Sequence, residues 1–108
     1  MDRLVITARL HPGTHSEAEA LLAKGPPFDP EAVGLRRHGA YLTNSEVVFV
    51  FEAREVEWIV SDLGNDPVLS TAFAPWRPII DEPPRIAHER YYWSRDESRT
   101  RVGIGLGL

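Results

Sequence analysis

The stretch Glu46-Val47-Val48-Phe49-Val50-Phe51-Glu52 constrains the architecture of this chain more than any other segment. Its five consecutive β-branched or aromatic residues, held between two carboxylates, are typical of a strand that is buried on both faces. Helices of the same chain can cover one of these faces. Because 108 residues are too few to supply a second helical layer, we expect a second copy of the chain to cover the other face.

Three further segments are predicted to be strands. Residues 3–10 alternate between apolar and more polar side chains, which is the period of a strand with one apolar face. Residues 34–44 form the next predicted strand, and the polar turn Thr43-Asn44-Ser45 joins it to the central stretch as a hairpin. Residues 85–93 follow a proline-rich segment and are predicted to form the last strand.

A first helix is predicted between Thr14 and Gly25. The sequence Thr14-His15-Ser16-Glu17 has the Thr-x-x-Glu form, in which a hydroxyl and a carboxylate bind the free amides of a helix start. The glycine and the two prolines that follow it end the helix. We expect its inward side to consist of Ala18, Leu21 and Leu22.

A second helix follows the central strand and is predicted to be broken. Its apolar residues recur at the spacing i, i+3, i+4 and i+7 and form one helical stripe, Val56, Ile59, Val60 and Leu63. Gly64 is predicted to end this stretch, and Asp66-Pro67 to start another one. Trp58 lies off the stripe, so we expect it either to cap the helix surface or to contact another subunit.

The order strand, helix, strand, strand, helix, strand is the split β-α-β arrangement of a ferredoxin-like α+β domain. Such a domain has an antiparallel sheet with its helices on one face and its first and third strands in the middle. Over residues 3–93 this order of elements resembles the dimeric α/β barrel superfamily. The segments that carry the resemblance are residues 46–52, Asp66-Pro67, Ala74-Pro75-Trp76 and Glu89-Arg90-Tyr91-Tyr92-Trp93. The resemblance implies that two domains join their open sheet faces and enclose a cavity.

The chain is expected to form one domain over residues 1–93, followed by a tail over residues 94–108. In the tail, glycines alternate with aliphatic residues, which suits a segment packed on the domain or on a partner subunit. Either an added edge strand or a reach across to the partner would use Val102, Ile104, Leu106 and Leu108.

Composition narrows the classes of function. The formal net charge is −4, with 12 basic and 16 acidic residues interleaved, so a nucleic-acid partner is not expected. The sequence has no cysteine and so has no disulfide framework, thiolate nucleophile or Cys-based zinc site. The first residues lack the pattern of a signal peptide and no apolar run reaches membrane-spanning length, so we expect a cytoplasmic protein without membrane contact.

Candidate site residues are the polar and aromatic side chains that interrupt the apolar segments. His38 and His88 are candidates for proton transfer near neutral pH. The candidates for substrate binding are Arg9, Tyr41, Arg90 and Trp76. Each of these residues also has an ordinary structural role open to it, as a solvated, paired or core side chain.

Two local patterns leave questions open. On the second strand, the set Arg36, His38 and Ala40 lies opposite the set Arg37, Gly39 and Tyr41, and the sequence does not decide which set faces inward. His11 and His15 have a helical metal-ligand spacing, but Pro12-Gly13 between them prevents that geometry. We therefore expect no metal, and no cofactor is predicted.

The resemblance implies a broad range of functions, because the superfamily includes cofactor-independent monooxygenases, isomerases, haem-handling enzymes and proteins with no known reaction. Our first interpretation is a small homodimeric α/β barrel protein with a cavity for a small organic ligand and no assigned reaction. The alternative is a cofactor-independent monooxygenase- or isomerase-like enzyme acting on a small organic substrate. A noncatalytic binding dimer and a small-molecule enzyme are thus both open.

Overall fold

The computed structural model describes residues 2–95 and 99–102. Its elements in chain order are β1 (Asp2–Arg9), α1 (His15–Ala23), β2 (Arg37–Leu42), β3 (Glu46–Ala53), α2 (Val56–Asn65), α3 (Pro67–Ala72), the 3-10 helix η1 (Ala74–Ile79), β4 (Arg85–Ala87), β5 (Tyr91–Ser94) and β6 (Arg99–Val102). Among these described residues, no helix combines the length and apolar character that crossing a membrane requires.

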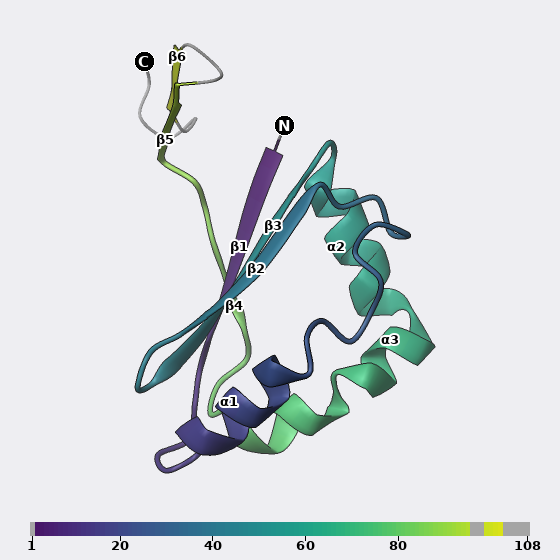
Figure 1. Ribbon diagram of the computed structural model, residues 1–108, viewed down its shortest axis with the longest axis vertical. Helices are drawn as coiled ribbons and strands as arrows, with labels where there is room; N and C mark the ends of the chain where they lie inside the picture. The colour runs from purple at the N-terminus through teal and green to yellow at the C-terminus, as the bar shows by residue number, and fades with distance from the viewer. Residues whose placement is uncertain (1, 96–98, 103–108) are drawn as a thin grey trace.

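The first four strands of the chain form one antiparallel sheet in the order β2-β3-β1-β4. The first and third strands therefore lie in the middle, and α1, α2 and α3 all lie on one side of the sheet (Figure 1). This topology confirms the predicted α+β ferredoxin-like fold.

The central strand β3 divides its side chains between two very different surroundings, because successive residues of a strand point to opposite faces. Val47, Phe51 and Ala53 are buried against the helices. Val48 and Val50 point to the opposite face, which is only partly shielded. We call that second surface the open face. The helices thus cover one face of the apolar stretch 46–52, and the described part of the chain places no helix over the other face.

The core on the helix side has two parts. One gathers around the start of α2, with Leu4, Leu35, Phe51, Ala53, Val56 and Leu63. The other lies between α1 and η1, with Ala8, Leu10, Ala18, Val47, Trp76 and Ile79. Ala18 is buried and Leu21 and Leu22 pack against this second part, as the predicted inward side of α1 requires.

Two predictions about helix ends are wrong. Thr14 does not make the predicted capping box, because its hydroxyl donates to the carbonyl oxygen of His11 at 2.7 Å and makes no bond to the amides of α1. Gly64 does not end α2, which continues to Asn65. The backbone of Gly64 stays at negative φ, and the amide of Asp66 still bonds the carbonyl oxygen of Asp62 at 3.1 Å. Glycine is permissive of many conformations and does not by itself stop a helix.

The predicted last strand, 85–93, is divided in two by the structure. β4 pairs with β1, whereas β5 pairs with β6 in a separate hairpin that points away from the sheet (Figure 1). The register explains the division: Val5 faces Ala87, so residues from Tyr91 onward would lie beyond Asp2, where β1 begins. With no neighbouring strand left in the sheet, the chain turns away and pairs with itself.

The tail is described only in part. β6 ends at Val102, which is paired with Tyr91. The predicted contacts of Ile104, Leu106 and Leu108 lie outside the described residues.

Candidate functional site

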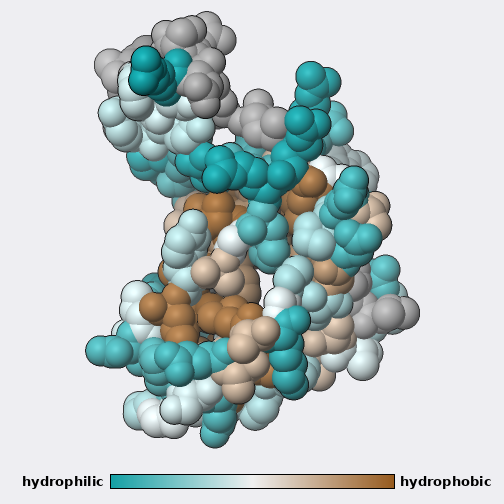
Figure 2. All heavy atoms as spheres, in the orientation of Figure 1, coloured by the Kyte–Doolittle hydropathy of each residue, from teal (hydrophilic) through white to brown (hydrophobic). Residues whose placement is uncertain are grey.

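Two adjoining hollows lie between the sheet and its helices. The larger has a volume of about 590 Å³ and the smaller about 260 Å³. We call the two together the chamber. Both are lined by the same four aromatic side chains, Phe49, Phe51, Phe73 and Trp76. Figure 2 shows apolar residues gathered in the hollowed middle of this face of the molecule.

The aromatic wall of the chamber follows from the alternation of β3 and from the turn of η1. Phe49 and Phe51 lie two residues apart on β3 and therefore share its helix-side face. Trp76 on η1 meets Phe49 edge to face, with ring centroids 5.5 Å apart and the ring planes at 84°. This is a favourable aromatic geometry, which holds the two rings in a defined relation.

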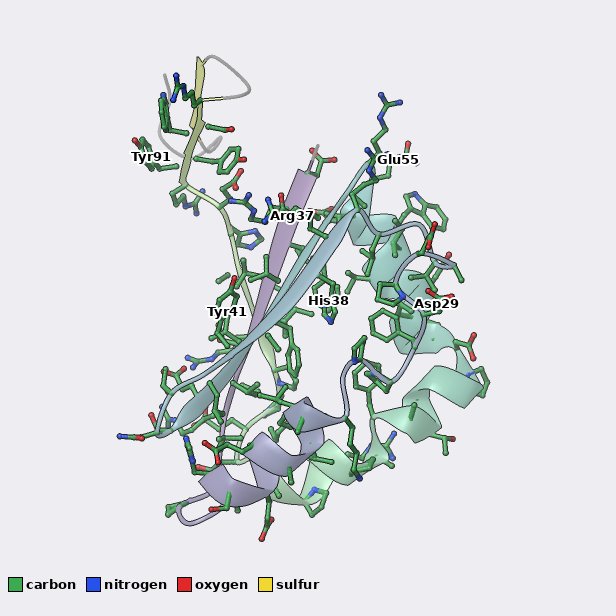
Figure 3. All side chains as sticks on the ribbon, in the orientation of Figure 1. Asp29, Arg37, His38, Tyr41, Glu55 and Tyr91 are labelled. Atoms are coloured by element: carbon green, nitrogen blue, oxygen red, sulfur yellow. The ribbon has the colours of Figure 1, made fainter. Side chains whose placement is uncertain are left out.

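His38 enters the chamber from β2. Its ring lies 4.6 Å from Phe51 and 5.4 Å from Phe28, measured between centroids. Nδ1 lies 3.0 Å from the carbonyl oxygen of Val50. A carbonyl oxygen can only accept, so Nδ1 carries the proton and donates, which leaves Nε2 of the neutral ring as an acceptor. Figure 3 shows this side chain pointing from β2 to the helix side of the sheet.

The surroundings of His38 favour its neutral form. Burial among apolar rings lowers its pKa below the ordinary value of 6.5, and the bond to Val50 opposes this only in part. Among the residues that line the smaller hollow, His38 is the ionisable one, and the others are apolar residues and glycines. The chamber therefore holds a neutral imidazole with a free lone pair at neutral pH, which is the state that a general base requires.

The larger hollow has a charged rim, formed by Arg77, Asp81 and Glu82. Arg77 Nη2 donates to Ser70 Oγ at 2.9 Å. Asp81 Oδ1 lies 3.2 Å from His11 Nδ1. Each rim side chain is thus held in place by a neighbour within the described chain.

Of the six candidate residues, the structure brings His38 and Trp76 into the chamber. Tyr41 lies on the open face and is 61% exposed. Arg9 is an exposed residue at the end of β1, where its Nη1 donates to Glu82 Oε1 at 3.1 Å. His88 and Arg90 are exposed in the segment between β4 and β5.

The register of β2 decides the question that its sequence left open. His38 faces Phe51 and Ala40 faces Phe49, so this set points to the helices. Tyr41 pairs with Val48 and shares the open face with it. Sequence reasoning missed Phe73 and Arg77 as chamber residues, because helical spacing marks Phe73 equally well as core and a lone arginine beside a proline carries no signal of its own.

The open face has an apolar middle and charged ends. Its middle is formed by Val5, Thr7, Val48 and Val50, the partly buried residues that alternate with the helix-side set. At one end, Arg3 lies 3.0 Å from Glu52 and 3.5 Å from Glu89. At the other end, Arg85 lies 3.9 Å from Glu46.

The histidines that raised the question of a metal have separate partners. His11 lies beside Asp81, and His15 Nδ1 is 3.8 Å from Glu19 Oε1 on the next turn of α1. Within residues 2–95 and 99–102, no three metal-ligating side chains gather at one place.

No protein-family model and no curated protein matches this sequence. Solved structures do match the chain. Tetracenomycin F2 cyclase from Streptomyces glaucescens, a type-II polyketide cyclase, matches with a TM-score of 0.66 at 15% identity, over 87% of this chain and 98% of the cyclase. L-Rhamnose mutarotase from Formosa agariphila matches with a TM-score of 0.67 at 12% identity, over 87% of this chain and 100% of the mutarotase. This chain shares the ferredoxin-like fold of these proteins.

This fold does not single out a reaction. A protein of unknown function from Nitrosomonas europaea, NE2512, matches with a TM-score of 0.62 at 17% identity, over 79% of this chain and 82% of that protein. Cyclase, mutarotase and a protein of unknown function thus share one backbone arrangement, and at these identities the likeness concerns the fold alone. The function of this chain therefore depends on the particular side chains of its chamber.

Proposed function

We propose that this protein binds a small, largely aromatic organic molecule in the chamber and that His38 exchanges a proton with it. The observation that carries the proposal is the neutral imidazole of His38 in an aromatic wall, fixed through Nδ1 on the carbonyl oxygen of Val50. The chamber volume supports it, because cavities of about 300–1,000 Å³ are typical of small-molecule sites.

The proton transfer would run from an acidic C–H or O–H bond of the ligand to Nε2 of His38. The electron pair of the broken bond stays on the ligand as an enolate or phenolate, and the ring becomes an imidazolium. Return of the proton to a different ligand atom completes an isomerisation. Reaction of the same anion with molecular oxygen would instead begin a cofactor-independent monooxygenation. Both outcomes share the first step, so the first step is what an experiment must detect.

A test combines binding with isotope exchange. We expect aromatic ketones with slowly exchanging C–H bonds beside the carbonyl group, such as 2-tetralone and 1-indanone, to raise the melting temperature. In D₂O the wild type should accelerate loss of the ligand's acidic C–H signal in NMR spectra, and His38→Gln should abolish the acceleration. His15→Gln, whose ring lies on α1 and does not line the chamber, is the matched control.

The noncatalytic alternative makes a different prediction for the same samples. It is favoured by the composition of the smaller hollow, where His38 is the ionisable residue and no second acid or base faces it. Under this alternative the ligands stabilise the wild type and His38→Gln alike, and exchange proceeds at the uncatalysed rate. If none of the ligands stabilises the wild type, the chamber is not their site and the proposal fails in both forms.

We further propose that the protein is a homodimer joined through the open face. Support comes from the layout of that face, an apolar middle between charged ends, which matches the apolar core and polar rim of protein interfaces. In such a dimer Arg9 and Tyr41 would border the interface. Light scattering at tens of micromolar protein should give twice the mass of the chain, and a monomer at that concentration would refute the dimer.

The hairpin β5–β6 is included in this dimer proposal. Tyr91 is 69% exposed and Trp93 is 56% exposed, and the two lie on the same face of β5. Aromatic side chains displayed in this way favour contact with a partner subunit. Truncation after Ser94 should therefore weaken the dimer, and an unchanged dimer affinity and melting temperature would show that the tail takes no part.

A further inference from the structure

We propose that Arg77 receives an acidic oxygen of the ligand, so that the chamber selects flat apolar anions such as aromatic carboxylates. This inference rests on the proposed binding of an aromatic molecule in the chamber. The inference specifies the charge and the orientation of that molecule. The anionic group of the ligand lies at the rim of the larger hollow, and the rest of the ligand lies along the aromatic wall.

The arginines of the described chain differ in whether a carboxylate neutralises their charge. Arg3, Arg9, Arg37 and Arg85 each have a carboxylate oxygen within 4 Å. The other arginines whose side chains the structure describes have no such partner among the described residues, and Arg77 is the one of them that lines the larger hollow. Within the described chain the hydrogen bonds of Arg77 go to Ser70 Oγ at 2.9 Å and to the Ser70 carbonyl oxygen at 3.4 Å. Both are neutral acceptors. They orient the guanidinium without neutralising its charge.

The Arg77 guanidinium also has N–H donors that its bonds to Ser70 do not use. A guanidinium has five N–H donors in a planar fork, and both bonds to Ser70 come from Nη2. The donors on Nη1 and Nε have no partner of their own among the residues that the structure describes. A carboxylate can accept two parallel hydrogen bonds from such a fork, and charge-assisted bonds of this kind are the strong ones.

Two acidic residues on the same rim, Asp81 and Glu82, would repel an anion unless other groups engage them. Glu82 is neutralised by Arg9, whose Nη1 lies 3.1 Å from its Oε1. Asp81 is held toward the end of β1, where its amide donates to the carbonyl oxygen of Arg9 at 2.8 Å and its carboxylate lies beside His11. Both acidic side chains thus contact residues at the end of β1 or just after it, whereas Arg77 bonds to Ser70 of α3.

The shape of the ligand follows from the walls. The hollow that Arg77 borders is lined by Phe49, Phe73 and Trp76, and it has about 590 Å³ of space. Flat rings stack well against such walls, while a hydrophilic ligand would leave its polar groups without partners there. An aromatic ring system with one acidic group at its edge satisfies the wall and the rim together.

The test uses two probes of nearly equal shape, 2-naphthoate and the neutral 2-naphthamide, titrated into the full chain by calorimetry. We expect the wild type to bind naphthoate about five-fold more tightly than naphthamide, a modest factor because Arg77 is exposed to solvent on one side. Arg77→Gln should abolish this preference, and Arg77→Lys should retain part of it, because lysine keeps the charge without the fork.

Two controls separate ligand binding from a structural role of Arg77. Ser70→Ala removes the side-chain anchor of the guanidinium but leaves its charge and its bond to the Ser70 carbonyl oxygen, so part of the preference for naphthoate should persist. Arg54→Gln removes an exposed arginine that does not line the chamber and should change neither affinity. If Ser70→Ala abolishes the preference as fully as Arg77→Gln does, Arg77 acts by holding α3 and the inference is overturned.

The outcomes also distinguish this inference from the proposed function. Equal binding of both probes by the wild type would overturn the role of Arg77 and leave the chamber as a site for aromatic ligands. A preference for naphthoate that survives Arg77→Gln would do the same. Binding of neither probe to the wild type would count against the chamber as an aromatic site and would remove the inference with it.

Discussion

At the scale of single residues, His38 shows how the neighbours of a polar side chain set its protonation state. The same imidazole on the open face would be solvated, as the exposed side chain of Tyr41 is. On the helix-side face it is packed between Phe28 and Phe51, and it keeps one hydrogen bond, to a backbone carbonyl. Burial therefore makes its protonation unfavourable, and the backbone bond fixes which nitrogen remains available.

The lowered pKa of His38 predicts a pH dependence of stability. In the unfolded chain the ring takes up a proton as the pH falls through about 6.5, whereas in the folded protein it takes up that proton only at lower pH. The free energy of unfolding should therefore decrease as the pH falls below about 6.5, since the unfolded state then binds more protons. Above that pH the contribution is fully present.

Urea unfolding at several pH values between 7.5 and 5 checks this prediction. His38→Gln should have the shallower decrease, because it lacks this proton uptake, and all other ionisable groups stay the same in both proteins. Equal slopes in the wild type and His38→Gln would mean that the folded ring titrates normally.

A second prediction at this scale compares two glycines, whose substitutions should have opposite signs. Gly34 has φ of +91°, a conformation that L side chains rarely adopt, so Gly34→Ala should lower the free energy of unfolding by about 1–2 kcal/mol. Gly64 lies in α2 with open space around its Cα, so Gly64→Ala should raise it by about 0.5–1 kcal/mol.

Chemical denaturation at one fixed protein concentration measures both glycine variants. The Gly64 result bears directly on the helix end that the sequence misplaced. If Gly64→Ala destabilises the protein, α2 does not run through this position in solution.

At the scale of elements, the hairpin β5–β6 depends on contacts at its base, because an isolated two-stranded hairpin is only marginally stable in water. Arg3 provides these contacts: its guanidinium carbon lies 4.0 Å from the centre of the Tyr92 ring, and its Nη1 lies 3.5 Å from Glu89. Burial opposes the charge of Arg3, but Glu52, Tyr92 and Glu89 together outweigh burial and raise its pKa.

Removal of the Arg3–Tyr92 contact should therefore loosen the hairpin. We expect Tyr92→Leu to speed amide hydrogen exchange in residues 91–94 by roughly two- to five-fold, in line with about 0.5–1 kcal/mol for a cation–π contact. The amides of β3 in the same sample serve as the internal control and should be unchanged. Unaltered exchange in the hairpin would show that other contacts hold it.

At the scale of the whole molecule, the sheet presents two faces with opposite roles. The helix side carries the chamber with His38 and the aromatic wall. The open face carries the apolar middle and the ion pairs at its ends. The proposed chemistry and the proposed assembly thus lie on opposite sides of one sheet, and a substitution on β3 is expected to affect one or the other according to whether its position is odd or even.

This separation predicts that assembly can be broken without filling the chamber. Val50→Asp places a charge in the middle of the open face, where a partner subunit would have to bury it, so we expect the dimer to dissociate at least a hundred-fold more readily. Sedimentation at several concentrations measures the effect, and Thr7→Ser, a small change on the same face, is the control. A Val50→Asp protein with the mass and affinity of the wild type would exclude the open face as the interface.

Neighbouring positions along the chain predict the order of the elements, the position of β3 at the centre of the sheet, and the apolar sides of α1 and α2. These follow from local spacing, since a period of two or of 3.6 residues is carried by neighbouring positions along the chain. Trp76 and His38 were selected as candidates for the same reason, as distinctive side chains within apolar segments.

The tertiary fold settles three further features: which face of β2 turns to the helices, where the last strand divides, and which candidate residues meet. Each of these depends on register between strands that lie far apart in sequence: Phe51 opposite His38, and Ala87 opposite Val5. A shift of one residue would move every side chain of a strand to the other face, and an alternating sequence of mixed polarity such as that of β2 carries too little preference to choose. The chamber arises from that choice.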